Sequence, residues 1–297
     1  MMVLSKNLEG AAWILASCIA GTVFSVGIKA LAGAIHSIEI TAIRCIIGMM
    51  ILAPLIWRAG GLRKTLKSDH WKIQIFRGFI AVIAINCGFY TLTVLPLTTA
   101  TTLFFTAPLF VTILAPIMLK ETVGWRRYTA TAAGFAGVLI VLRPFDSAFD
   151  PNMLVALFSS IFFAFSLILS KRLSVTESPT TMMAYFAIVT IIFAVPPALP
   201  LWLWPTPLEW VILVVVSIFA TCRTYFDIKG FSAGDASFVA PFQYFRIIFI
   251  SASAYLIFSE VPDTYTIAGA SVIIAATLYI AQREARLKTT KPGAAAA

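Results

Sequence analysis

Charged residues are scarce in this sequence. Only 12% of its 297 residues are Asp, Glu, Lys or Arg, whereas 60% are apolar. Soluble domains carry about 25% charged residues, so a soluble fold of this length is excluded. The apolar residues come in runs of about 20, the length with which a helix crosses the hydrocarbon core of a bilayer, and the alternating segments of a membrane barrel are absent. The sequence therefore predicts an all-α integral membrane protein in contact with the lipid bilayer.

Residues for metal, redox or nucleophilic chemistry are also few. The two histidines lie at loop edges, the four cysteines lie inside apolar segments, and the chain contains neither a CxxC nor an HExxH motif. The sequence has no glycine-rich phosphate-binding loop, so ATP hydrolysis is not encoded here. A membrane enzyme would need acidic, His or Cys residues clustered at one membrane face. We therefore expect no catalytic residue, no metal and no cofactor.

The apolar runs predict ten transmembrane helices joined by short loops. The first run, from Gly10, is too long for the apolar core of a signal peptide and is interpreted as a membrane helix. The ten expected spans cover residues 10–32, 39–57, 73–94, 97–119, 125–142, 151–172, 180–203, 208–228, 235–258 and 264–282.

Basic residues predict the orientation of the chain. Of the 22 Lys and Arg residues, 16 fall in or beside loops on the side of the N-terminus, one (Arg143) falls on the other side, and five fall within spans. This asymmetry is the positive-inside pattern of membrane proteins, and it predicts that both termini are cytoplasmic. Because the basic residues are spread over short loops, the net charge of +9 does not indicate nucleic acid as a partner.

Short matches relate the two halves of the chain. The matching stretches are 29–31 with 171–173, and Cys87 and Tyr90 with Cys222 and Tyr225. Each half has five expected spans, an odd number, so the second copy is inverted in the membrane, as in many secondary transporters. We expect a first repeat over residues 1–148, an inverted second repeat over 149–287, and a polar, Ala-rich tail over 288–297.

Two paired motifs carry a resemblance to a known family. Each has an Ala-Pro pair in an apolar helix, a Glu at the end of that helix and a glycine in the next one. The pairs are Ala107-Pro108 with Glu121 and Gly134, and Ala240-Pro241 with Glu260 and Gly269. This pattern resembles the drug/metabolite transporter superfamily, in particular its EamA-like family of ten-helix bacterial metabolite and amino-acid exporters. The resemblance implies an inner-membrane bundle in which the first, third, fourth, sixth, eighth and ninth helices surround a central cavity.

Five basic residues lie within spans, where an ionisable group is costly and points to function. Lys29, Arg44, Arg77 and Arg223 lie within about two turns of an expected helix end, and we interpret them as structural residues whose side chains reach the interface. Arg246 lies near the middle of the ninth span and cannot reach water unless a cavity comes to it. It is the first candidate for solute binding, and the alternative is a buried Arg capped by backbone carbonyls.

A set of polar and aromatic residues is expected around Arg246. Its members lie one turn away on the same helix face, at matching places in the two repeats, or among the hydroxyls of the fourth and sixth spans. The set comprises Gln243, Tyr90, Tyr225, Asn86, Thr102 and Ser166. With one fixed cation these groups suit a polar solute that carries a carboxylate. The alternative for each hydroxyl is an ordinary hydrogen bond between helices.

The acidic residues also bear on function. All 13 lie in loops or at the ends of expected spans, so no mid-membrane carboxylate is expected to exchange a proton for solute. This favours a facilitator or exchanger of small polar metabolites, with amino-acid export as the main hypothesis. The alternatives are uptake of a vitamin or nucleoside-like solute and, outside transport, a membrane scaffold or a membrane-embedded enzyme. The sequence leaves the oligomeric state open and is compatible with a monomer.

Overall fold

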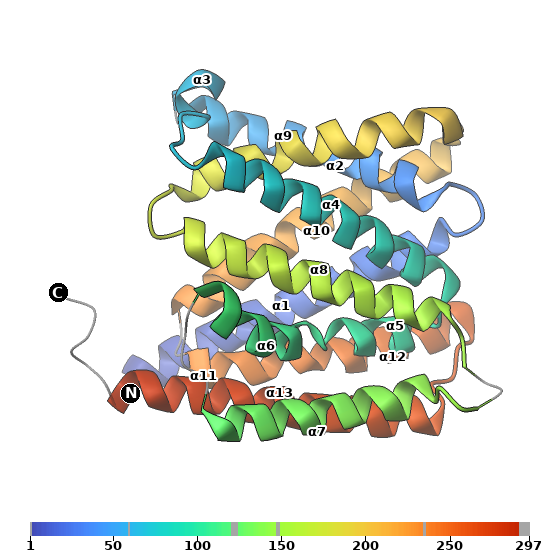
Figure 1. Cartoon of the computed structure of the whole chain (residues 1–297). Helices are drawn as coiled ribbons and strands as arrows, with labels where there is room; N and C mark the ends of the chain where they lie inside the picture. The colour runs from blue at the N-terminus through green and yellow to red at the C-terminus, as the bar shows by residue number, and fades with distance from the viewer. Residues whose placement is uncertain (1, 59, 120–123, 147–148, 234–235, 291–297) are drawn as a thin grey trace.

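In the computed structural model the chain forms a bundle of helices that run roughly side by side (Figure 1). The structure describes residues 2–290 except 59, 120–123, 147–148 and 234–235, and every regular element in these residues is helical. The first helix begins and the last helix ends at the same end of the bundle (Figure 1), here called the terminal end. The opposite end, here called the distal end, holds the links 31–36, 143–151 and 259–263.

The long helices correspond to the expected spans, with bounds that differ by a few residues. They are α1 (Met2–Ala30), α2 (Ser37–Arg58), α4 (Trp71–Val94), α7 (Trp125–Leu142), α8 (Asn152–Leu173), α9 (Pro179–Ala198), α10 (Pro207–Ala233) and α13 (Thr264–Thr290). Two short elements lie in links, namely α3 (Leu62–Thr65) and the 3-10 helix η1 (Leu199–Leu201). Helix α13 includes residues 288–290 of the expected tail, and 291–297 lie outside the described residues.

Two spans are interrupted. The fourth span consists of α5 (Leu97–Phe104) and α6 (Ala107–Leu119). The ninth consists of α11 (Ala236–Val239), the 3-10 helix η2 (Ala240–Tyr244) and α12 (Phe245–Phe258). These are corresponding spans of the two expected repeats.

The chain is a multi-pass membrane protein. Within the described ranges, nine segments are long and apolar enough to cross a membrane. The expected span that is not among these nine is 125–142, which is α7, an 18-residue helix whose first turn carries Arg126 and Arg127. The count of ten and the inverted arrangement remain predictions.

Glycine residues let α7 and α13 approach closely. A Cβ on Gly137 would lie 3.0 Å from the backbone oxygen of Gly269, and a Cβ on Gly269 would lie 2.6 Å from the backbone oxygen of Gly137. Either side chain would push the helices apart, so these small residues serve helix packing, as in many membrane bundles.

Proline explains the break in the fourth span. Pro108 has no N–H, and its ring would clash with the carbonyl of Phe104 four residues earlier, at which α5 ends. The carbonyl of Leu103 beside the break accepts hydrogen bonds from Ser160 Oγ at 3.0 Å and from Thr106 Oγ1 at 2.6 Å. This carbonyl also accepts a hydrogen bond from the backbone N–H of Thr106 at 3.1 Å. The side-chain hydroxyls thus add to the hydrogen bonding of the backbone at the break, which a lipid interior requires to be satisfied.

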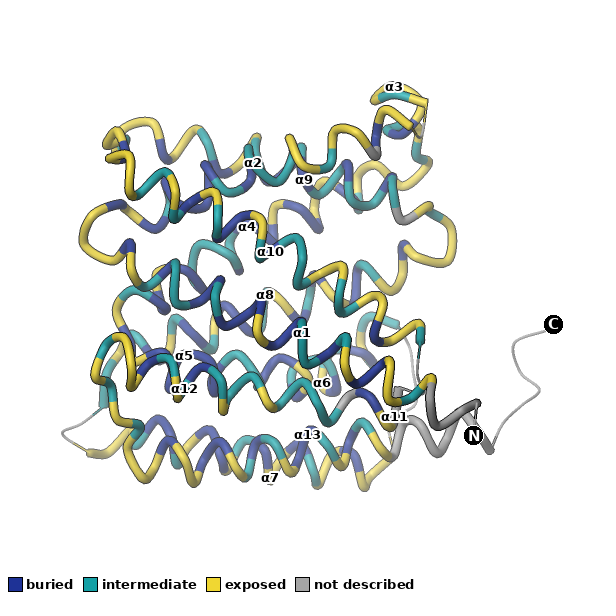
Figure 2. Tube along the Cα trace, turned by 180° about the vertical axis from the view of Figure 1, so that it is seen from behind, coloured by how far each residue is buried: buried dark blue, intermediate teal, exposed yellow. Residues whose placement is uncertain are grey.

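Helices at the outside of the bundle are buried on one face only. Outer helices such as α2, α7, α9 and α13 have one buried and one exposed face (Figure 2). Large apolar side chains on the exposed faces include Ile117 at 73% and Leu256 at 79% exposure. Such apolar surface is suited to lipid rather than water.

Candidate functional site

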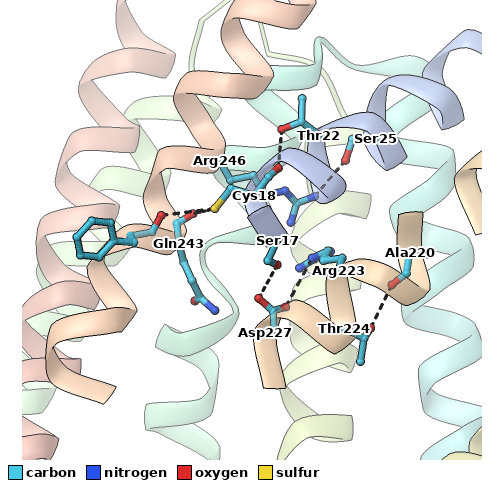
Figure 3. A network of polar contacts seen from close by, with 11 residues as sticks. Ser17, Cys18, Thr22, Ser25, Ala220, Arg223, Thr224, Asp227, Gln243 and Arg246 are labelled. Carbon is cyan, nitrogen blue, oxygen red and sulfur yellow. Dashed lines mark hydrogen bonds and ion pairs between the residues drawn. The ribbon is translucent and has the colours of Figure 1, made fainter. Parts of the chain in front are cut away.

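A polar centre lies where α1, α10 and α12 meet (Figure 3). Helix α1 contributes Ser17, Gly21 and Ser25, which are four residues apart and therefore share one face. Arg223 of α10 and Arg246 of α12 both extend toward this face. A Cβ on Gly21 would lie 3.1 Å from Cδ of Arg223 and 3.2 Å from Nε of Arg246, so only glycine admits both side chains without displacement.

Arg246 is the second residue of α12, which begins directly after the 3-10 helix η2. Its Nη2 donates a hydrogen bond to Ser25 Oγ at 3.0 Å, whereas its buried Nε has no partner among the described residues. The carbonyls of Phe242 and Gln243 in η2 face the Cys18 thiol, each at 3.5 Å. The described contacts of Arg246 therefore include a hydroxyl but no carbonyl cap, and part of the guanidinium remains available to a ligand.

Asp227 corrects the expectation that no carboxylate accompanies Arg246. Helix α10 continues to Ala233, so Asp227 lies inside a helix and not at the end of a span. Its Oδ1 accepts a hydrogen bond from Ser17 Oγ at 2.5 Å, and its Oδ2 lies 3.9 Å from Nε of Arg223. It is also close enough to attract the charge of Arg246. The expectation was wrong because the eighth span was drawn too short.

Arg44 of α2 adds a third guanidinium to this region. Its Cζ lies 5.7 Å from the ring centroid of Phe24 and 5.7 Å from that of Phe89, within the range at which aromatic faces attract a cation. Arg44 is also close enough to Arg223 for the two charges to repel. In the described residues the polar centre thus combines three arginines with one carboxylate, that of Asp227.

The other two basic residues within spans are held by partners. Arg77 is buried and donates hydrogen bonds to Ser170 Oγ at 3.0 Å, to Gln74 Oε1 at 3.2 Å and to the carbonyl of Met182 at 2.7 Å. It therefore joins α4, α8 and α9, and its role is structural.

Lys29 forms an ion pair with Glu260 and donates to the carbonyl of Leu95 at 2.8 Å. Lys29 and Arg77 both have partners within the bundle, so a structural role fits them, whereas Arg44 and Arg223 belong to the polar centre. That the four side chains reach the membrane interface remains a prediction.

The two tyrosines of the candidate set lie away from the polar centre. Tyr225 follows Arg223 by two residues, which places it on the other side of α10, and it is 51% exposed with its ring edge-on to Trp13. Tyr90 lies in the last turns of α4 at the distal end, and its hydroxyl donates to Asn152 Oδ1 at 3.0 Å. Their matching places in the two repeats do not bring them to Arg246, because Tyr225 lies on the outer face of α10 and Tyr90 lies at the distal end of α4.

The remaining candidates are buried or partly buried polar residues. Asn86 Nδ2 donates to the carbonyl of Val82 in its own helix at 3.1 Å, and its Oδ1 has no partner among the described residues. Thr102 is fully buried with an equally unpartnered hydroxyl, and Ser166 is buried in α8. In the part of the chain that the structure describes, no hydrogen bond or ion pair links these three, or the side chain of Gln243, to Arg246. Their part in solute binding remains a prediction.

The two interrupted spans meet beside the polar centre. The ring of Phe105, at the break of the fourth span, lies 5.1 Å from the ring of Tyr244, which directly precedes α12. Interruptions at corresponding positions of two repeats are a feature of transporter binding sites. The paired Ala-Pro motifs signal this in the sequence, and the Ser17, Gly21 and Ser25 spacing on α1 is a second signal that the sequence reading missed.

Two surface hollows lie elsewhere. One is beside Arg143 at the distal end and the other is beside Lys171 at the terminal end, and residues of the polar centre line neither of them. The central cavity that the family resemblance implied remains a prediction.

Comparison with known proteins identifies relatives along nearly the whole chain. It is 34% identical over 288 residues to an S-adenosylmethionine uptake transporter from Rickettsia felis, covering 97% of both chains. It is 27% identical over 290 residues to a riboflavin transporter from Vibrio cholerae, covering 96% of this chain and 97% of that one. It is also 27% identical over 274 residues to the pseudopaline exporter from Pseudomonas aeruginosa, covering 91% of this chain and 95% of that one.

A solved crystal structure shares the fold, with a TM-score of 0.62 and 19% sequence identity over 95% of this chain and 98% of the other. The family model of EamA-like transporters matches residues 8–143 and, separately, residues 151–282. All three relatives above are named as transporters of small metabolites. The chain therefore belongs to the EamA-like transporter family, within the drug/metabolite transporter superfamily, and is a membrane transporter of small metabolites.

Proposed function

We propose that this chain takes up S-adenosylmethionine or a solute with the same groups, an amino acid joined to adenosine. Relatives named as S-adenosylmethionine uptake transporters are 33–34% identical over at least 95% of the chain. Their names favour the alternative of a vitamin or nucleoside-like solute over amino-acid export, which none of the relatives above is named for. The amino-acid part of the solute keeps the carboxylate that Arg246 was expected to bind.

The observation that carries the proposal is that Arg246 and Asp227 meet the same face of α1, Arg246 beside Gly21 and Asp227 at Ser17 one turn earlier. An amino-acid group presents a carboxylate and an ammonium close together. A guanidinium holds a carboxylate through two parallel hydrogen bonds, and the Asp227 carboxylate complements an ammonium. Arg246 retains an unpartnered Nε for this purpose. The polar centre thus offers one group of each sign to the amino-acid end of the solute.

Riboflavin suits this centre less well. It has no charged group, so it could offer the guanidinium of Arg246 and the carboxylate of Asp227 only neutral hydrogen-bond partners, which bind ionised groups less strongly than oppositely charged ones do. The charged centre therefore favours the amino-acid-bearing nucleoside over the flavin.

The transport cycle follows from the expected architecture. We propose that the halves matched separately by the family model are inverted repeats in the bacterial inner membrane, with both termini cytoplasmic, and that they rock around the polar centre. Asp227 is already paired with Ser17 and Arg223, which favours a facilitator or exchanger over a proton-driven pump.

The test is uptake of radiolabelled S-adenosylmethionine into proteoliposomes. We expect saturable uptake that excess unlabelled S-adenosylmethionine inhibits and that riboflavin does not. Arg246→Met should abolish uptake, whereas the matched control Arg172→Met, at an exposed position at the terminal end of α8, should leave it unchanged. Uptake no greater than in protein-free liposomes, with riboflavin entering instead, would refute the proposal.

A further inference from the structure

The charges of the polar centre do not balance. Asp227 lies 3.9 Å from Arg223 and close enough to Arg246 to attract its charge. Arg44 has no acidic neighbour of this kind. Among the described residues, the titratable groups close enough to interact electrostatically with Arg44 are the thiol of the adjacent Cys45 and the guanidinium of Arg223, which carries the same charge. The described residues therefore leave an excess of positive charge on the Arg44 side of the centre.

The contacts of Arg44 leave its hydrogen-bonding capacity unused. Phe24 and Phe89 hold its guanidinium with their rings, each centroid 5.7 Å from Cζ, but rings accept no conventional hydrogen bond. Its buried Nε has no partner among the described residues, and no hydrogen bond from its other N–H groups is found there. A guanidinium has five N–H donors, and inside a membrane protein such donors are normally satisfied.

The proposed solute does not remove this excess. Its amino-acid end is a zwitterion, so the carboxylate bound by Arg246 is offset by an ammonium, and the sulfonium of S-adenosylmethionine adds a further positive charge. This reasoning rests on the proposed function, but the excess at Arg44 exists in the protein without any solute. A second negative charge is needed to neutralise it.

We propose that Arg44 and Arg223 form an anion-binding site beside the Arg246 site, and that one negatively charged group binds there during transport. Phe24 and Phe89 fix the plane of the Arg44 guanidinium, so that its unpartnered edge is presented to the anion. The anion is a free inorganic ion such as chloride or, where the transported solute is an anionic one in place of S-adenosylmethionine, an anionic group of that solute. Both sources share the same chemistry, a compact anion held by N–H donors of two guanidiniums.

Chloride is the first probe, and it is tested without solute. The melting temperature of the purified protein is measured in sodium chloride and in sodium gluconate at equal ionic strength. We expect chloride to raise the melting temperature of the wild type by about 2 °C or more, since a ligand that binds only the folded state stabilises it. Arg44→Gln should abolish the difference, and Arg44→Lys, which keeps the charge, should retain part of it.

The controls separate this site from a general salt effect and from the uptake proposal. Arg172→Gln, at the exposed terminal end of α8, should respond to chloride as the wild type does. If Arg44→Gln does not fold, Phe89→Leu serves in its place, because it removes one ring, keeps every charge and should weaken the chloride response several-fold. Failure of S-adenosylmethionine uptake would refute the proposed function and would not change the chloride measurement.

The second arm examines the solute as the source of the anion. Binding of the transported solutes is compared between wild type and Arg44→Gln in gluconate. If chloride has no effect but the variant binds an anionic solute at least tenfold more weakly, the solute supplies the group and the site stands. If neither chloride nor any solute distinguishes Arg44→Gln from the wild type, the anion site is refuted.

Discussion

Lys29 in the last turn of α1 forms an ion pair with Glu260, which follows α12, and the same carboxylate accepts a hydrogen bond from the backbone N–H of Leu97 at 2.9 Å. Lys29 also donates to the carbonyl of Leu95. These contacts join α1, the link before α5 and the end of α12 at the distal end of the bundle.

Removal of this pair should open the distal end. The hydroxyl oxygen of Thr98 lies 3.2 Å from that of Ser251 of α12. In a variant without native cysteines, Thr98→Cys should react faster with an impermeant thiol reagent when Glu260→Gln is added. We expect about a tenfold increase, which corresponds to about 1.4 kcal/mol of closing free energy. Asp263→Asn, which removes the more exposed pair with Arg143, is the matched control with little effect. Equal rates with and without Glu260→Gln would show that the pair does not keep the distal end closed.

Substitutions of Arg246 should affect recognition more than stability. Arg246→Lys keeps the charge but loses the planar fork, so we expect at least about a tenfold loss of transport. Arg246→Met should abolish transport without lowering the melting temperature, because it removes a buried charge whose described hydrogen bond is to the hydroxyl of Ser25. Loss of melting temperature in the Met variant would instead indicate a structural role, and normal transport would exclude Arg246 from the site.

Transport should depend little on a proton gradient. Asp227 is hydrogen-bonded to Ser17 and paired with Arg223, and Glu39 is buried near the distal end, where it accepts from the N–H of Leu203 at 3.2 Å. In proteoliposomes an imposed pH gradient should therefore change the initial rate by less than about twofold. Uphill accumulation driven by a pH gradient alone, abolished in Asp227→Asn, would identify Asp227 as a proton carrier.

Topology is tested by labelling single cysteines in intact cells. Phe145, in the link between the two halves, is fully exposed, so Phe145→Cys should react with an impermeant reagent from outside. Lys67→Cys, in the link before α4, should react only after the cells are permeabilised. This outcome follows from the 16-to-1 distribution of loop basic residues. The reverse pattern of labelling would invert the orientation.

Asp263 should make stability depend on acidity. Partial burial raises its pKa, but hydrogen bonds from Thr266 Oγ1 at 2.7 Å and Thr266 N at 2.9 Å, with Arg143 nearby, lower the pKa below the ordinary value of 3.8. Its stabilisation is thus complete above that value and is lost as the pH falls through the lower pKa of the folded state.

Asp263 also caps the first turn of α13, so Asp263→Ala should cost about 0.5–2 kcal/mol near neutral pH. The melting temperatures of the wild type and of Asp263→Ala, measured from about pH 6 to pH 3, should converge at the acid end. A constant difference across this range would show that protonation of Asp263 does not contribute.

The sequence alone determined the class and the family of this protein. Long apolar runs need a bilayer, and the paired Ala-Pro motifs, at Pro108 and Pro241, carried the resemblance to the family. The two spans that contain these prolines were expected to be continuous, and their interruption is a finding of the structure. Arg246 stood out because a cation inside a span is costly and needs a partner. These are local properties of the chain and can be read without knowing which helices are neighbours.

The tertiary structure decided the composition of the polar centre. The centre draws on α1, α2, α10 and α12. Only packing shows that Gly21, Arg223 and Asp227 lie beside Arg246 and that Arg44 lies near Arg223. Because Arg223 faces the centre, Tyr225, two positions later in the same helix, faces outward. Spacing within one helix defines a face, but the partner of that face depends on contacts between helices that the sequence of either helix does not contain.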